Sequence, residues 1–188
     1  MRGSVKEEQL GTRPITDVWI LARPKVKYYG AFPNGFLERA RVLLGVAQTD
    51  YVLHVCSGRV KDYPGVRGKG KNDFTLDADP AVEPDHCVDL TDEDIPYAPG
   101  FAQWDAILCD PPYTPEDAAM YGGKGVGFPS PAELLRKCVQ VLKPGGRAGM
   151  LHYIWARPPA ALRSVAVVAV LMGFGNRVRV FSVYERTE

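Results

Sequence analysis

Residues 107–113 read Ile107-Leu108-Cys109-Asp110-Pro111-Pro112-Tyr113, an apolar run that stops abruptly at an acid, two prolines and an aromatic ring. The apolar half predicts a buried strand of a parallel sheet. The prolines end that strand, because proline fixes φ and removes a backbone donor. Asp110 and Tyr113 are therefore expected at the carboxyl end of a strand, where open α/β sheets bind their ligands. An acid, a carbonyl and a flat ring at this place suit a planar group that carries an amine.

The segments on either side alternate between predicted strands and predicted helices. Residues 130–133 read Ser-Pro-Ala-Glu, which predicts a capped helix start. The alternation implies an α/β fold with a mostly parallel sheet and helices on both of its faces. Strands are expected at 17–22, 51–56, 74–76, 87–88, 104–109, 147–154 and 178–184, and helices at 34–44, 130–142 and 159–172.

Length and composition predict one ordinary globular domain. The chain has 188 residues, of which 46% are hydrophobic and 24% charged. We expect a single domain over residues 15–188, preceded by a flexible segment at 1–14. A bilayer-length apolar segment and a signal-peptide core are both absent from the sequence, which favours a cytoplasmic protein without a membrane partner. The four cysteines show no paired spacing, so we expect reduced thiols and no metal site: Cys56, Cys87, Cys109 and Cys138.

Charge is segregated along the chain although the net charge is only +1. Nine acids lie between residues 73 and 94, and the chain is basic again after residue 135. Such segregation suits one side that faces a polyanion and another that holds ribose hydroxyls, although a merely solvated surface is an equal alternative. The candidate nucleic-acid-binding residues are five cations of the loop at 59–71 and one in the loop at 121–128: Arg59, Lys61, Arg67, Lys69, Lys71 and Lys124.

The motif Asp110-Pro111-Pro112-Tyr113 after an apolar strand resembles the catalytic signature of S-adenosylmethionine-dependent amino-methyltransferases, which methylate exocyclic nitrogens of adenine or cytosine. Related motifs occur in guanine-N2 and protein-glutamine methyltransferases. The resemblance implies a Rossmann-like class I methyltransferase fold and a catalytic role for all four residues. Asp110 and the Pro111 carbonyl would accept the two N–H groups of the amine, and Tyr113 would stack on an extruded base.

The resemblance extends over roughly residues 25–155 and implies a site for S-adenosyl-L-methionine. Asp77 would take the ribose hydroxyls and Asp89 the adenine amino group of the cofactor, and Gly58 would let the backbone approach the ligand. His54 lies inside an apolar strand and is interpreted as a core residue. The implied cofactor-binding residues are Phe32, Pro33, Cys56, Ser57, Gly58, Asp77, Asp89, Leu90 and Asp110.

The chain departs from the family pattern at three places. The second glycine and the helix that usually follow Gly58 are replaced by the glycine-rich basic loop, where a regular helix is not expected. A separate target-recognition domain is missing, so specificity would come from the loops at 59–73 and 114–129 or from a partner subunit. Only one predicted helix and one predicted strand follow residue 154, which leaves open whether the sheet has its usual final strand.

The function expected from the resemblance is methyl transfer to adenine N6 in DNA. Cytosine N4 offers the same kind of amine and stays open. Two alternatives remain: an RNA base methyltransferase, because compact domains can take specificity from RNA shape, and a degenerate, non-catalytic subunit that binds nucleic acid.

Overall fold

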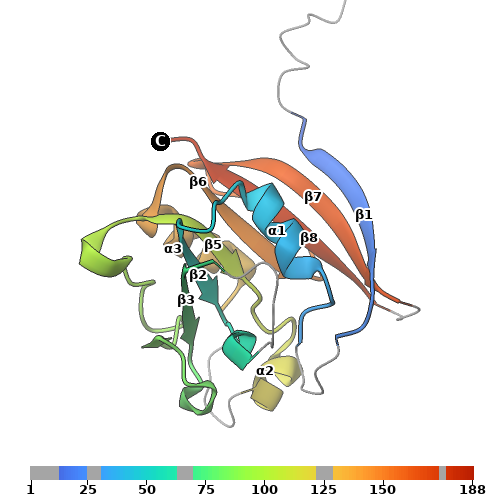
Figure 1. Ribbon diagram of the computed structural model, residues 1–188, viewed down its shortest axis with the longest axis horizontal. Helices are drawn as coiled ribbons and strands as arrows, with labels where there is room; N and C mark the ends of the chain where they lie inside the picture. The colour runs from blue at the N-terminus through green and yellow to red at the C-terminus, as the bar shows by residue number, and fades with distance from the viewer. Residues whose placement is uncertain (1–12, 25–30, 63–69, 122–128, 174–176) are drawn as a thin grey trace, which may run out of the picture.

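The computed structural model describes residues 13–24, 31–62, 70–121, 129–173 and 177–188. Within these ranges eight strands form one sheet in the order β1-β7-β8-β6-β5-β2-β3-β4 (Figure 1). Neighbouring strands are parallel except β8, which is antiparallel to both β6 and β7. The strands are β1 (Ile15–Leu21), β2 (Tyr51–Val55), β3 (Asn72–Asp77), β4 (His86–Cys87), β5 (Trp104–Cys109), β6 (Leu142–His152), β7 (Leu162–Met172) and β8 (Val178–Arg186).

This topology brings the ends of strands β1 to β7 and the beginning of β8 to one edge of the sheet, which we call the carboxyl edge. The predicted α/β class with a mostly parallel sheet is therefore confirmed. The first twelve residues, which include most of the segment expected to be flexible, lie outside the described residues.

Helices cover both faces, as expected. Helix α1 (Phe36–Leu44) packs on one face, and α3 (Pro131–Val141) packs on the other (Figure 1). The short helix α2 (Pro115–Tyr121) follows the motif Asp110-Pro111-Pro112-Tyr113. Three 3-10 turns complete the helical elements of the described residues: η2 (Val60–Asp62), η3 (Pro80–Val82) and η4 (Pro99–Phe101).

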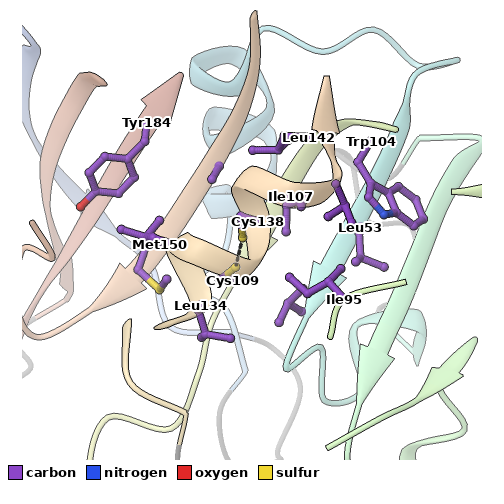
Figure 2. Packing of buried hydrophobic residues seen from close by; sticks show 14 of the residues in the cluster. Leu53, Ile95, Trp104, Ile107, Cys109, Leu134, Cys138, Leu142, Met150 and Tyr184 are labelled. Atoms are coloured by element: carbon purple, nitrogen blue, oxygen red, sulfur yellow. Dashed lines mark hydrogen bonds between the residues drawn. The ribbon is translucent and has the colours of Figure 1, made fainter. Parts of the chain in front are cut away.

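Each face of the sheet has its own apolar core, because side chains alternate along a strand. On the α3 side, the core joins Leu53, Ile107, Cys138 and Met150 (Figure 2). The sulfurs of Cys109 and Cys138 lie 3.8 Å apart in it. A disulfide needs about 2.05 Å, and all four cysteines are free.

The predicted capped start of α3 is confirmed. The backbone N–H of Glu133 donates to Ser130 Oγ, and the backbone N–H of Ser130 donates to the Glu133 carboxylate at 3.1 Å. The two bonds satisfy donors that a helix N-terminus would otherwise leave unpaired. The helix ends at Val141, and Leu142 already belongs to β6, five residues before the predicted strand start at Arg147. The extra residues form an irregular start of the strand, since the β5–β6 register shifts between Trp104 and Ala106.

The helix predicted at 159–172 is wrong, because this segment is strand β7. An unbroken apolar run does not by itself distinguish a buried strand from a helix. Its valines favour a strand, since β-branched side chains suit a pleated surface. As a strand, β7 pairs with both β1 and β8, and β8 lies between β6 and β7. The sheet therefore does not lack its final strand.

A buried ionic network ties α1 to β2 and β3. Asp73 Oδ1 accepts from Arg41 Nη1 at 2.8 Å, and its Oδ2 lies 3.0 Å from His54 Nε2. The side chains of these residues are at most 8% exposed. His54 is thus a core residue, as interpreted from the sequence. Gly70 packs against the network so closely that a Cβ would lie 2.6 Å from Asp73 Oδ1, so only glycine fits there.

Replacing Asp73 with alanine should destabilise the fold by about 3–5 kcal/mol, because it leaves the buried charge of Arg41 uncompensated. Chemical denaturation measures this free energy of unfolding. The matched control is Asp94→Ala, which breaks an exposed pair with Lys137 in which Asp94 is 68% exposed and should cost about 1 kcal/mol or less. Equal losses in the two variants would contradict a structural role for the network.

In the part of the chain that the structure describes, no helix is long and apolar enough to cross a membrane.

Candidate active site

Asp110 lies directly after β5 at the carboxyl edge, as the sequence predicted. Its backbone N–H donates to the carbonyl of Val55 at 3.1 Å, which ties the motif to the end of β2. The Tyr113 hydroxyl donates to Asp110 Oδ1 at 2.8 Å. No described residue donates to Asp110 Oδ2. One oxygen of the carboxylate is therefore held by the protein, and the other has no donor among the described residues.

Burial raises the pKa of Asp110 to about 7, against the opposing charge of Arg179 and the hydrogen bond from Tyr113. A carboxyl with such a pKa changes its charge near neutral pH. Perturbed carboxyls of this kind concentrate at functional sites. Pro111 is buried and Pro112 is half-buried, so the turn that follows Asp110 is held within the protein.

An aromatic wall lines the motif on the β6 side. The ring centroid of Tyr113 lies 4.4 Å from that of Tyr153 and 5.2 Å from that of His152. His152 ends β6, the neighbour of β5, at the same edge of the sheet. Its Nδ1 accepts from the backbone N–H of Ile154 at 3.2 Å, and burial lowers its pKa. The imidazole is therefore neutral and carries its proton on Nε2, which has no hydrogen-bond partner among the described residues.

Two arginines reach this wall from β8 and the residues before it. Arg179 Nη1 lies 3.5 Å from the Tyr113 hydroxyl, and Arg177 Nη1 donates to the Tyr153 hydroxyl at 2.9 Å. Sequence reasoning missed both arginines, together with His152 and Tyr153. The sequence does predict a strand end near 154 and a strand start at 178. These two ends lie at the same edge of the sheet only because the last strand is antiparallel, which the sequence does not show.

The glycine loop after β2 is organised by Asp77. Its Oδ2 accepts from the Gly58 backbone N–H at 2.8 Å, and its Oδ1 accepts from the Asp79 backbone N–H at 3.0 Å. Gly58 has a left-handed φ of 49°, and no heavy atom of the described residues lies within 4 Å of where a Cβ would be. Ser57 is buried, and its backbone N–H donates to the Leu76 carbonyl. Among the described residues the loop therefore adjoins open space, and the Asp77 carboxylate fixes its backbone.

Three predicted acids converge on the residue before this loop. Burial raises the pKa of the Cys56 thiol, and the charges of Asp77, Asp110 and Asp89 raise it further. Asp89 also accepts at Oδ1 from the backbone and hydroxyl of Thr91. The acids that end successive strands thus lie around one position at the carboxyl edge.

The other predicted cofactor residues belong to the apolar core. Leu90 is buried on the α3 side. Phe32 is buried on the α1 side, where its ring stacks on Phe36 at 5.1 Å. Pro33 is also buried, and its carbonyl accepts from the first residue of α1.

The described cations of the basic loop do not form one surface. Lys61 donates to Asp85 at 2.7 Å and to the Glu83 carbonyl. Lys71 precedes β3 and therefore lies at the edge opposite to Asp77 and Asp110, where its backbone N–H donates to the Gln48 carbonyl. Arg59 lies beside Gly58. Arg67, Lys69 and Lys124 lie outside the described residues.

The sheet order and the site at the carboxyl edge define the Rossmann-like fold of class I methyltransferases. No family model matches the chain, and no curated protein matches it in sequence. Solved structures do match. TrmN from Thermus thermophilus is 15% identical with a TM-score of 0.54, and the match covers 84% of this chain and 50% of that one.

Two further structures match over most of both chains. The putative methylase HI0767 from Haemophilus influenzae is 11% identical with a TM-score of 0.53, covering 83% of this chain and 100% of that one. The putative methyltransferase yhhF from Escherichia coli is 11% identical with a TM-score of 0.52, covering 81% and 86%. The chain thus spans half the length of TrmN and nearly the whole length of the other two. At these identities the likeness shows a shared fold.

Proposed function

We propose that the protein transfers a methyl group from S-adenosylmethionine to the exocyclic amine of a nucleic-acid base, with adenine N6 in DNA as the first candidate. The observation that carries the proposal is the Asp110 carboxylate at the end of β5. One of its oxygens has no donor among the described residues, and it lies near the glycine loop and its acids. An acceptor of this kind, at the carboxyl edge of the sheet, suits an amine substrate.

The residues at the ends of β2, β3 and β4 fit the cofactor. Open space beside Gly58 leaves room for the ligand. The Asp77 carboxylate accepts backbone N–H groups of Gly58 and Asp79, and a carboxylate has about four lone-pair sites in all, so it would also accept from a ribose hydroxyl. A similar fold is seen in the N-methyltransferase NodS from Bradyrhizobium japonicum, in complex with S-adenosylhomocysteine, at 14% identity and a TM-score of 0.50. When bound, S-adenosylmethionine would supply an electrophilic methyl group on its sulfonium.

The chain's own residues would act by positioning. Asp110 Oδ2 and the Pro111 carbonyl would accept the two N–H groups of the amine. These bonds draw the nitrogen away from conjugation with the ring and aim its lone pair at the methyl group. The Tyr113 ring would bound the base, with Tyr153 and His152 packed behind it. An amine inside a stacked duplex is out of reach, so the base must be extruded or single-stranded.

Two alternatives keep a place. RNA is the first, because the described residues offer a compact site without a separate recognition domain. A non-catalytic subunit is the second, and the basic loop in place of the usual helix after Gly58 is the feature that favours it. Tyr113 donates to one carboxylate oxygen of Asp110, and the other oxygen has no donor among the described residues. This arrangement suits a substrate amine and therefore favours an enzyme.

One experiment separates these functions. The purified protein is incubated with S-adenosylmethionine and either DNA or RNA, and the digested nucleosides are analysed by mass spectrometry. N6-methyldeoxyadenosine without any methylated ribonucleoside supports the first candidate. A methylated ribonucleoside supports the RNA alternative. Calorimetric binding of S-adenosylmethionine without any methylated nucleoside would favour the non-catalytic subunit.

The basic loop provides a test of the nucleic-acid partner. Replacing Arg67 and Lys69 with alanine should flatten the salt dependence of nucleic-acid binding, with each lost phosphate contact lowering the log–log slope by roughly 0.7–0.9. Fluorescence anisotropy over a series of salt concentrations measures the slope. The matched control is Lys143→Ala, which removes a cation paired with Asp105 at the start of β6 and should leave the slope unchanged. Loss of cofactor affinity in the double variant, with the wild-type slope retained, would show that the loop serves the cofactor instead.

A further inference from the structure

Arg179 contacts the candidate catalytic motif from a different part of the chain. It is the second residue of β8. Its Nη1 lies 3.5 Å from the Tyr113 hydroxyl, which in turn donates to Asp110 Oδ1 at 2.8 Å. Its Nη2 is buried and has no hydrogen-bond partner among the described residues. A half-buried guanidinium with an unused donor is costly, which indicates a role beyond packing.

Negative charge accumulates around Cys56, the residue that follows β2. The carboxylates of Asp77, Asp89 and Asp110 all act on the Cys56 thiol. Arg179 is the described cation whose charge acts on Asp110. Its neighbour Arg177 is directed elsewhere, because its guanidinium carbon lies 5.7 Å from the ring centroid of Tyr153 and its Nη1 donates to the hydroxyl of that ring. Arg179 therefore acts on Tyr113 and Asp110, whereas Arg177 contacts Tyr153.

We propose that Arg179 is a positioning residue for the methyl-acceptor site: its guanidinium orients the Tyr113 hydroxyl toward Asp110 and balances the charge of that buried carboxylate. The role rests on the proposed function of Asp110 as the acceptor of the substrate amine. Arginine suits it, because its planar guanidinium stays charged and offers several donors in fixed directions. Tyr113 is thereby held by its hydroxyl at one end and by the aromatic wall along its ring.

The proposal predicts how Asp110 titrates. Burial raises its pKa, while the charge of Arg179 and the hydrogen bond from Tyr113 lower it. Without Arg179 the effect of burial is less opposed, and the pKa should rise further above about 7. The other titratable groups around Asp110 stay in place in the test: Tyr113 and Cys109 beside it in the chain, Cys56 after β2, Asp77 and Asp89 after β3 and β4, and His152 and Tyr153 at the end of β6.

The test measures the titration of Asp110 directly. The carboxyl carbon of Asp110 is followed by NMR from pH 5 to 9 in the full-length protein without cofactor, with Asp110→Asn used to assign its signal. In Arg179→Gln the midpoint should rise by about one pH unit or more, since a nearby opposite charge typically shifts a carboxyl by 1–3 units. In Arg179→Lys the midpoint should lie between those of the wild type and Arg179→Gln. The matched control Arg177→Gln should leave the midpoint unchanged.

Kinetics provide the second readout. The rising limb of kcat against pH should move upward with the NMR midpoint in Arg179→Gln, so that at pH 7 its kcat falls about fivefold or more while its KM for S-adenosylmethionine is retained. An unchanged midpoint in Arg179→Gln, or an equal shift in Arg177→Gln, would overturn the proposal.

If Arg179→Gln does not fold, the midpoints of Arg179→Lys and Tyr113→Phe test the proposal in its place. Tyr113→Phe should raise the midpoint by less than one pH unit, and wild-type midpoints in both would overturn the proposal. A shifted midpoint in a protein that methylates no substrate would refute the proposed function and leave the pairing of Arg179 with Asp110 intact.

Discussion

Replacing Asp110 with alanine is expected to reduce methyl transfer by about a hundredfold or more, the usual effect of removing an oriented hydrogen-bonding group from an active site. Binding of S-adenosylmethionine should be nearly unchanged, because the ribose and adenine contacts are assigned to other acids. Single-turnover kinetics and calorimetry measure the two quantities on the same preparation. A loss of cofactor affinity with normal turnover at saturation would place Asp110 in the cofactor site instead.

The same carboxyl sets the expected pH dependence. Its pKa is raised to about 7, and the carboxylate is the form that accepts the amine. Methyl transfer should therefore increase with pH through about 7 and level off roughly one unit above it. The folded state also holds this proton more tightly than the unfolded state, whose carboxyl has a pKa of about 3.9. The contribution of Asp110 to stability should accordingly fall as pH rises from about 4 to 7.

The variant Asp110→Asn separates these effects, because it keeps the shape of the side chain and removes the charge. It should be inactive, more stable than the wild type at pH 8, and closer to the wild type in stability at pH 5. Denaturant titrations at the two pH values measure the difference. A constant difference in unfolding free energy at both pH values would contradict the raised pKa.

Replacing Asp77 with alanine is expected to weaken S-adenosylmethionine binding by about 1–3 kcal/mol, which is roughly five- to 150-fold. The variant removes the acceptor of the Gly58 backbone N–H and the candidate acceptor of the ribose hydroxyls. Turnover at saturating cofactor should change far less than affinity. Calorimetric titration gives the dissociation constant.

Asp79→Ala is the matched control for Asp77, because Asp79 lies two residues further along and caps the turn Pro80–Val82 through the backbone N–H of Ala81. It should retain cofactor affinity. Wild-type affinity in the Asp77 variant would show that this acid only shapes the loop. Equal losses in both variants would indicate a general disturbance of the connection after β3.

The comparison with solved structures supports the fold and leaves the polymer open. The four structures reported share 11–15% of their residues with this chain, and the methylated substrate depends on the loops of each protein. Function resides in the site and not in the fold. Mass spectrometry of the digested nucleosides therefore distinguishes a DNA substrate from an RNA substrate.

Much of the fold follows from local sequence. The apolar runs before Cys56 and Asp110 predict strands because buried parallel strands are continuously hydrophobic. The Ser130 capping box predicts the start of α3 because its hydrogen bonds are local. The placement of Asp77, Asp89 and Asp110 at one edge also follows, since parallel strands bring their carboxyl ends together. These features depend on neighbours in the chain or on the direction of the strands.

Tertiary structure decided the rest. The segment 162–172 is apolar enough for a buried helix, and only pairing with β1 and β8 makes it a strand. That pairing inserts β8 antiparallel beside β6 and thereby brings Arg179 to Tyr113, 66 residues away in the chain. The positive charge beside Asp110 was hidden in the sequence for this reason: local patterns report which residues form a strand, whereas its direction and neighbours depend on contacts between distant segments.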